Sequence, residues 1–360
     1  MKHKFLLLAL LLGFTGYAGG GTVLAASQAK HYTVTSPDGR LKVEIDNANG
    51  LTYSVSCRNQ TLLAPSSLGL VLQDGTSIGK KVGKVRSSKH TEHIEAPFYR
   101  VKNFTASYHE LDMSLENGFG LRFRAYNEGV AYRFYTTRRT QVTIAQEIAQ
   151  FRFNDDHTAW LPYTTNEKKP FAMAYQNIYD VASLSKAQSK PAFLPVTVDC
   201  GGAKLTLLES DLEQYPGMFV QAKGQELQGI FAPYPSKTDF YPGRKQEYVT
   251  ATQDYIARST GTRNYPWRVL AVTEDDRDMP VNNLVYALAS PNRIGDTWWI
   301  RPGKVAWDWW NDWNLKQVPF KSGINMETYK YYIDFARNTT WSMWYSTRAG
   351  TRPRAAICSP

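Results

Sequence analysis

Cysteine is scarce in this chain of 360 residues, which contains only Cys57, Cys200 and Cys358. An exported protein that depended on disulfides would carry a larger and even set of cysteines, so we do not expect a disulfide framework. A single bridge between Cys57 and Cys200 is possible, but no spacing pattern supports it. The fold must therefore be held together by its hydrophobic core.

Long apolar runs are also lacking, because no stretch beyond the N-terminus approaches the roughly 20 residues that cross a bilayer. The N-terminus carries Lys2 and Lys4, an apolar run from Phe5 to Phe14 and the small-residue site Val23-Leu24-Ala25. This pattern predicts a signal peptide over residues 1–25. We expect an exported protein, periplasmic or extracellular, with no membrane insertion after the signal is removed.

Blocks of like charge are absent as well, although the formal net charge is +10. Lysine and arginine alternate with aspartate and glutamate, which is typical of a solvated surface and argues against a nucleic-acid partner. The six histidines show no metal-ligand spacing, and there is no glycine-rich phosphate loop, nucleophile elbow or CxxC motif. Several common classes of enzyme are thereby excluded.

Short alternating strands dominate residues 27–265. Leu41–Ile45, Leu51–Val55, Gly120–Ala125 and Val130–Tyr135 alternate apolar with polar residues, so each should have one buried and one solvated face. Turn sequences such as Ser-Pro-Asp-Gly and Asn-Glu-Gly separate the strands. The pattern predicts a mainly β fold, a large antiparallel β-sandwich.

The pattern changes over residues 266–338. Trp267–Val272 and Lys304–Trp310 are apolar runs typical of buried strands, and residues 281–289 indicate a short helix or buried connector. Asn325 can cap a helix that continues to Arg337. Strand, loop and helix in this order predict the start of a βα architecture, and one such unit cannot close into a barrel by itself.

The tail, residues 339–360, has no regular period and collects Arg, Thr, Pro and Ser. A disordered tail is one interpretation, and a reading-frame error is the other. In the shifted frame, each new codon consists of the third base of one codon and the first two bases of the next. In this frame Met343-Trp344-Tyr345 necessarily encodes Val-Val. Synonymous codons over residues 340–351 then permit L-E-Y-V-V-L-D-E-G-W-Y, a buried strand with an acidic and aromatic end.

Three motifs carry a resemblance to a known family. They are Glu209-Ser-Asp-Leu-Glu-Gln-Tyr-Pro-Gly-Met218, Trp307-Asp-Trp-Trp-Asn-Asp-Trp-Asn314 and Tyr329-Lys-Tyr-Tyr-Ile-Asp-Phe-Ala336. In this order they resemble glycoside hydrolase family ninety-seven, exported bacterial α-glucosidases and α-galactosidases. The resemblance runs from about residue 30 to Asn338.

The resemblance implies an N-terminal β-super-sandwich, a catalytic (β/α)8 barrel and a small C-terminal β domain. It also implies an oligosaccharide substrate and a calcium ion held by barrel carboxylates together with one glutamate of the N-terminal domain. The family's acid and its base or nucleophile come from later barrel strands, so we assign no catalytic residue here and expect this chain to be inactive. Glucoside or galactoside preference, and inversion or retention, stay open.

Glu209 is the candidate calcium ligand, because it follows the strand Lys204–Leu208 and calcium prefers carboxylate oxygens. Glu167, in the loop Tyr163–Pro170, is the competing candidate for the calcium ligand and is also a candidate for substrate binding. An ordinary solvated glutamate is the alternative at position 209.

Trp310, Asn311 and Asp312 are the candidate sugar-binding residues, since aromatic rings and amides suit the apolar faces and hydroxyl rims of sugars. If the strand continues to Trp310, Trp307 and Trp309 face one way and Asp308 and Trp310 the other. The alternative is that these tryptophans all belong to the core. The alternative for the whole protein is a non-catalytic carbohydrate-binding β-sandwich module, which would not need residues 300–338.

Nucleotide sequencing downstream of codon 338 tests the frameshift hypothesis. We expect the shifted frame to spell the missing strand over codons 341–351 and to stay open for a catalytic domain. Codons that cannot encode that strand would rule the hypothesis out.

Overall fold

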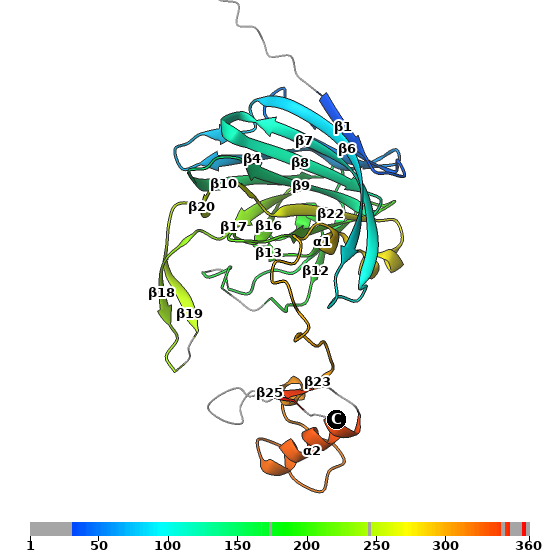
Figure 1. Ribbon diagram of the computed structural model, residues 1–360, viewed down its shortest axis with the longest axis vertical. Helices are drawn as coiled ribbons and strands as arrows, with labels where there is room; N and C mark the ends of the chain where they lie inside the picture. Colours follow the sequence, from blue (N-terminus) through cyan, green and yellow to red (C-terminus); the bar gives the residue numbers. More distant parts are fainter. Residues whose placement is uncertain are drawn as a thin grey trace, which may run out of the picture. The chain divides into compact units, whose positions relative to one another are not determined.

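The computed structural model describes residues 31–166, 168–172, 175–243 and 246–339, and the backbone of 343–345 and 355–357. The predicted signal peptide, Glu167 and Cys358 lie outside these residues. The described chain divides into two compact units (Figure 1). The larger contains the residues up to His90 and Ser107–Leu288, and the smaller contains Thr91–Ala106 and the residues from Ala289.

Two ten-stranded sheets form the main fold, and their neighbouring strands pair antiparallel. The first follows the order β1 (His31–Thr35), β2 (Leu41–Asp46), β3 (Thr52–Cys57), β4 (Gln60–Leu72), β10 (Gln141–Arg152), β17 (Glu226–Phe231), β16 (Met218–Lys223) and β13 (Ala192–Phe193). Two short strands extend it, β5 (Ser77–Ile78) on β4 and β20 (Ala257–Thr260) on β10. The predicted sandwich is confirmed.

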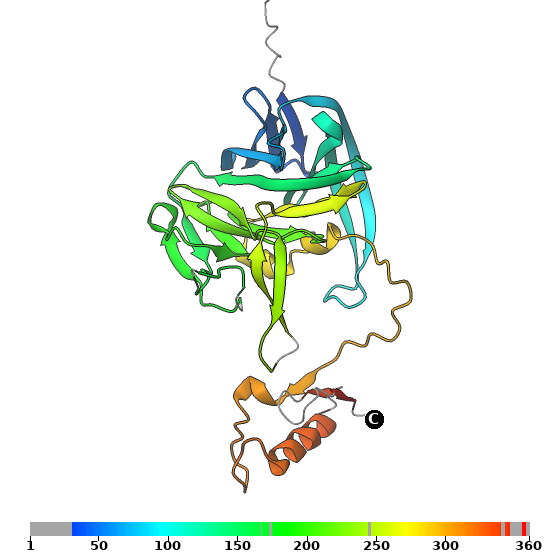
Figure 2. The ribbon, with the colours of Figure 1, turned by 90° about the vertical axis from the view of Figure 1, so that its left-hand side faces the viewer.

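The second sheet follows the order β12 (Asp180–Ser183), β11 (Thr158–Leu161), β14 (Val196–Asp199), β15 (Lys204–Ser210), β22 (Trp267–Thr273), β9 (Gly129–Thr136), β8 (Phe119–Tyr126), β7 (Asn103–Leu115) and β6 (Val82–Glu95). The short strand β21 (Arg263–Asn264) pairs with β9. A separate hairpin of β18 (Pro235–Phe240) and β19 (Glu247–Thr252) projects from the sheets (Figure 2).

Alternating apolar residues place the core between the sheets. In β2, Val43 is fully buried opposite Val55 of β3, and in β8, Leu121 is fully buried opposite Phe134 of β9. These residues belong to one hydrophobic cluster, to which both sheets contribute side chains. Cys57 and Cys200 are buried there as free thiols, and burial raises the pKa of Cys200 to about 12.

Strand β9 differs from the expectation of one solvated face, because nearly all of its residues are buried. On the face away from the core, the Arg133 guanidinium lies 4.7 Å from the centre of the Trp267 ring. Its Nη2 donates to Asp211 at 2.8 Å, and its Nε donates to the carbonyl of Tyr265 at 2.8 Å. The ion pair and the ring shield a face that the alternation alone would leave wet.

Strand β22 extends the sandwich beyond the predicted boundary at residue 265. It lies between β15 and β9, so the strand that we expected to open the second domain is central to the second sheet. A fully buried strand with sheet neighbours on both sides has the same apolar sequence whether it is parallel or antiparallel. After it, the 3-10 helix Asp276–Val281 and α1 (Leu284–Ala287) confirm the short connector, with Leu284 and Ala287 buried.

The smaller unit contains a strand–helix–strand sequence. Strand β23 (Val305–Trp307) is followed by α2 (Met326–Asn338), and β24 (Met343–Tyr345) pairs parallel with β23. The predicted cap is confirmed, because the Asn325 side chain accepts from the Thr328 N–H at 2.9 Å. Strand β25 (Ala355–Ile357) pairs antiparallel with β24, so the tail holds short strands where none was expected. The barrel itself stays a prediction.

The predicted strand Lys304–Trp310 is wrong in its second half. Asp308–Asn311 forms a 3-10 helix, and Asp312 and Trp313 follow with φ of 54° and 53°. The Trp313 N–H donates to the carbonyl of Asp308 at 3.0 Å, which closes the chain into a turn. The expected alternation of faces from Trp307 to Trp310 therefore does not exist.

A buried ion cluster, defined as Arg268, Glu147, Glu209 and Tyr215, joins the sheets. Arg268 of β22 is 1% exposed and donates through Nε and Nη2 to both oxygens of Glu147 of β10, each at 2.7 Å. Its Nη1 donates to Glu209 of β15 at 2.7 Å, and the Tyr215 hydroxyl donates to Glu147 at 2.8 Å. Paired Arg and carboxylate groups can stay charged in a core only because each satisfies the other.

Replacing the central cation should destabilise the sandwich. We expect Arg268→Leu to lower the free energy of unfolding by about 3–5 kcal/mol, because two buried carboxylates lose their partner. Urea denaturation followed by circular dichroism measures the change. Arg277→Leu is the matched control, since Arg277 pairs with Asp275 at an exposed site and should leave the midpoint unchanged. Equal midpoints for the two variants would contradict the role assigned to Arg268.

Candidate functional site

Glu209 is mostly buried, with 19% of its side chain exposed, so it is not an ordinary solvated glutamate. It is the penultimate residue of β15 and lies opposite Arg268 of β22. The Met218 N–H donates to its Oε1 at 3.2 Å and to its Oε2 at 3.0 Å, and Oε2 also binds Arg268. Burial raises the pKa of Glu209, while Arg268 and the Met218 N–H act in the opposite direction.

The described residues alone do not fit a calcium ion. Calcium takes six to eight oxygen ligands, several of them carboxylates. Within the described ranges no three acidic, histidine or cysteine side chains gather as a metal site, and both Glu209 oxygens already accept hydrogen bonds. Among the described residues, Glu209 binds the Arg268 guanidinium and the Met218 N–H at the start of β16.

Glu167 lies outside the described residues, but the turn beside it is visible. The Asn166 side-chain oxygen accepts from the Lys168 N–H at 3.0 Å and from the Lys169 N–H at 3.2 Å. The role of Glu167 stays a prediction.

Trp310 is 82% exposed and Trp309 is 50% exposed, so these two tryptophans are not core residues. The Trp307 ring centre lies 5.9 Å from that of Trp309 and 6.0 Å from that of Trp310. We call these three residues the tryptophan platform. Trp307 is half-buried, while the other two present exposed apolar faces that suit a sugar ring.

Asn311 is anchored beside the platform. Its Oδ1 accepts from the Tyr332 hydroxyl of α2 at 2.5 Å, and its Nδ2 donates to the carbonyl of Asn314 at 2.6 Å. Asp312 follows in the left-handed conformation at the end of the 3-10 helix. The structure thus brings Trp310, Asn311 and Asp312 together in one turn of the smaller unit, whereas Glu209 belongs to the larger unit.

Asp308 is a candidate that the sequence alone did not single out. It directly follows β23 and is completely buried, yet neither carboxylate oxygen has a hydrogen-bond partner in the part of the chain that the structure describes. A buried carboxylate without a partner is costly and often marks a functional position. The sequence signal that could have identified Asp308 as a candidate is its position directly after an apolar strand.

Among the described residues, no helix is long and apolar enough to cross a bilayer.

Solved structures with a similar fold are known. One solved structure, a glycoside hydrolase family 97 enzyme of Pseudoalteromonas sp. strain K8 in complex with acarbose, superposes with a TM-score of 0.71 and 22% identity. It covers 88% of this chain and 47% of its own. A β-arabinopyranosidase superposes with a TM-score of 0.68 and 20% identity, over 87% and 50% of the respective chains. At these identities the likeness shows the fold alone.

Two curated proteins match most of this chain. A retaining alpha-galactosidase of Bacteroides thetaiotaomicron is 38% identical over 347 residues, which are 93% of this chain and 51% of that protein. A probable retaining alpha-galactosidase of Streptomyces bingchenggensis is 25% identical over 350 residues, or 93% and 49%. The chain therefore spans about half the length of the curated relatives it matches.

The family profile described as "Glycosyl-hydrolase 97 N-terminal" matches residues 34–291. The match runs from the end of β1 to just beyond α1 and includes β22 and the ion cluster. It confirms the resemblance that the Glu209–Met218 motif indicated. This chain belongs to glycoside hydrolase family 97.

Proposed function

We propose that this chain is the N-terminal half of an exported α-galactosidase that cleaves α-galactosidic bonds with retention. The observation that carries the proposal is the 38% identity to a retaining alpha-galactosidase across 93% of the chain. The same identity favours galactoside over glucoside and retention over inversion, two alternatives that the sequence left open.

Retention uses two carboxyl groups about 5–5.5 Å apart, one as nucleophile and one as acid and later base. We place both groups in the half of the relatives' length that this chain does not span. Within this chain, the tryptophan platform and the Asn311 amide would bind a sugar ring of the oligosaccharide. The 360-residue chain would then bind carbohydrate without hydrolysing it.

Calcium dependence is a proposal for the complete protein only. The resemblance implies the ion, and calcium would supply charge that orients or polarises the substrate. Glu209 could contribute one oxygen, provided that further carboxylates come from outside the described residues.

A free-standing carbohydrate-binding module is the competing function. The strand–helix–strand sequence of the smaller unit argues against it, because Ala306 of β23 packs on Ala336 of α2 as in a βα unit. A binding module made only of the sandwich would have no use for this segment.

Hydrolysis of p-nitrophenyl α-galactoside tests the proposed function. We expect no release of nitrophenol by the 360-residue chain, and release by the product of the shifted reading frame. The α-glucoside should be cleaved at least tenfold more slowly, about 1.4 kcal/mol of discrimination. Proton NMR should show the α-anomer of galactose as the first product. Activity of the 360-residue chain, or a first product with the β configuration, would overturn the proposal.

A further inference from the structure

A pocket opens at the edge of the second sheet, beside the outermost strand β12. We call it the edge pocket. Its polar and aromatic lining is Tyr163, Tyr179, Asp180, Lys186 and Gln188, and Val181 and Ala182 of β12 complete it. The β11–β12 pairing builds one wall, with Leu161 opposite Asp180. The single 3-10 turn Leu184–Lys186 follows β12 and places Lys186 in the lining, anchored by the buried Leu184, whose N–H donates to the carbonyl of His157 at 2.9 Å.

The polar groups of the edge pocket are held in place by one another. The Gln188 N–H donates to the Tyr163 hydroxyl at 2.9 Å, and Gln188 Nε2 donates to Asp180 Oδ2 at 3.2 Å. A carboxylate offers about four acceptor sites, so Asp180 keeps capacity for the hydroxyl groups of a ligand. Lys186 adds an exposed ammonium, which only donates.

The aromatic side of the pocket is also supported from behind. Tyr179 is 37% exposed, and its ring meets Phe193 edge to face at 6.5 Å between centres. Exposed apolar residues adjoin it in the sequence, because Ile178 is 92% exposed and Val181, which also lines the pocket, is 59% exposed. A ligand longer than one ring would thus find further apolar surface next to the opening.

The charges select the class of ligand. One carboxylate and one ammonium balance, so the edge pocket attracts neither a phosphate nor a cation in particular. Two tyrosine rings beside a carboxylate, an amide and an ammonium match a neutral molecule with apolar faces and a rim of hydroxyls. Sugar rings have this form.

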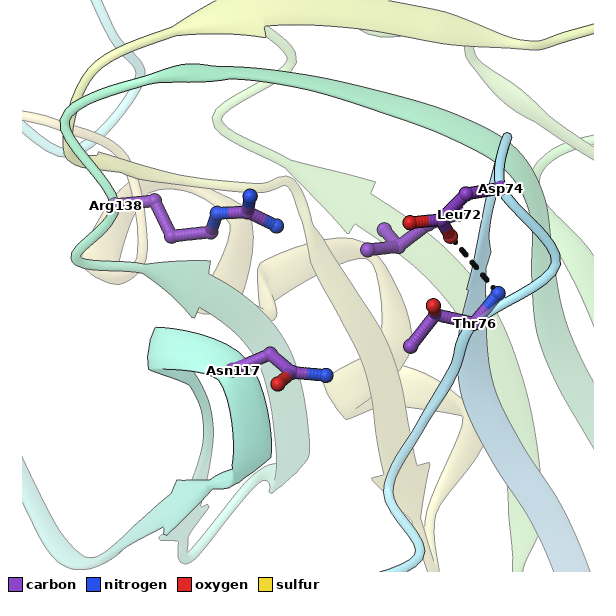
Figure 3. A pocket seen from close by; sticks show the side chains of 5 residues that line it. All are labelled: Leu72, Asp74, Thr76, Asn117 and Arg138. Atoms are coloured by element: carbon purple, nitrogen blue, oxygen red, sulfur yellow. Dashed lines mark hydrogen bonds between the residues drawn. The ribbon is translucent and has the colours of Figure 1, made fainter.

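A second depression on the larger unit differs from the edge pocket in its lining. Figure 3 shows its described lining of Leu72, Asp74, Thr76, Asn117 and Arg138, which includes no aromatic side chain. The Asp74 carboxylate accepts from the Thr76 N–H at 2.9 Å, as in an ordinary turn (Figure 3). This depression provides a control for the edge pocket.

We propose that the edge pocket, formed by Tyr163, Tyr179, Asp180, Lys186 and Gln188, binds one neutral sugar residue of an oligosaccharide. The choice of α-galactosides as ligands rests on the proposed function. Tyr179 supplies the apolar face, and Asp180, Lys186 and Gln188 bind hydroxyls. The sandwich would then bind substrate through its own residues, without the tryptophan platform.

Isothermal titration calorimetry of the 360-residue chain with raffinose tests this proposal. In a Trp310→Ala background, which removes the tryptophan platform as a second sugar site, we expect saturable binding that Tyr179→Ala and Asp180→Ala each weaken about tenfold or more, because each removes a central contact. Arg138→Ala, in the control depression, should bind as the Trp310→Ala parent does. Circular dichroism checks that every variant is folded.

The proposal is overturned if raffinose does not bind, or if Tyr179→Ala and Asp180→Ala bind normally while Trp310→Ala abolishes binding. Maltotriose in place of raffinose separates the two proposals. Binding of maltotriose alone, lost in Tyr179→Ala, would support the edge pocket and contradict the galactoside preference. Hydrolysis of the nitrophenyl galactoside by the complete protein, with no binding at the edge pocket, would support the proposed function and contradict the edge pocket.

Discussion

Arg268 is the residue on which the arrangement of the sandwich depends. It lies on β22, at the centre of the second sheet, and binds Glu147 on β10 in the middle of the first. Two hydrogen bonds of 2.7 Å fix the planar guanidinium against one carboxylate, which sets direction as well as distance. Apolar contacts alone would tolerate small shifts of one sheet against the other, whereas this pair does not.

The same cation connects the fold to the family's motif. Glu209 receives the third bond of Arg268 and also accepts the first N–H of β16, so the Glu209–Met218 turn is tied to both sheets. Tyr215, inside that turn, is 7% exposed and binds Glu147. The motif that pointed to the family thus has a structural reason to exist in the sandwich itself, whatever Glu209 does in a complete enzyme.

The sequence was a good guide where the structure is local. Alternation in β2, β3 and β8 predicted which residues enter the core, and Asn325 predicted the start of α2, because periodicity and capping act over a few residues. It failed where partners are distant in the chain. β22 was assigned beyond the sandwich because nothing in its apolar run tells which strands flank it. The face of β9 was predicted to be wet because Trp267 and Asp211 cannot be placed on it from the sequence.

The candidate site was likewise predictable where its structure is local, and not where residues distant in the chain come together. Trp310 was predicted near a sugar and is exposed, but the strand around it was wrong, because Asp312 and Trp313 adopt left-handed conformations without glycine. Arg268 and Glu147 are 121 residues apart, and the residues that line the edge pocket come from a loop, a strand and a turn. No spacing rule joins such positions before the fold is known.

Amide hydrogen exchange of the 360-residue chain tests most directly whether the sandwich is organised around Arg268. The account predicts that amides of β10, β15 and β22 exchange most slowly, by global unfolding only, while the exposed hairpin of β18 and β19 exchanges far faster. Exchange of β22 as fast as that of the hairpin would contradict it.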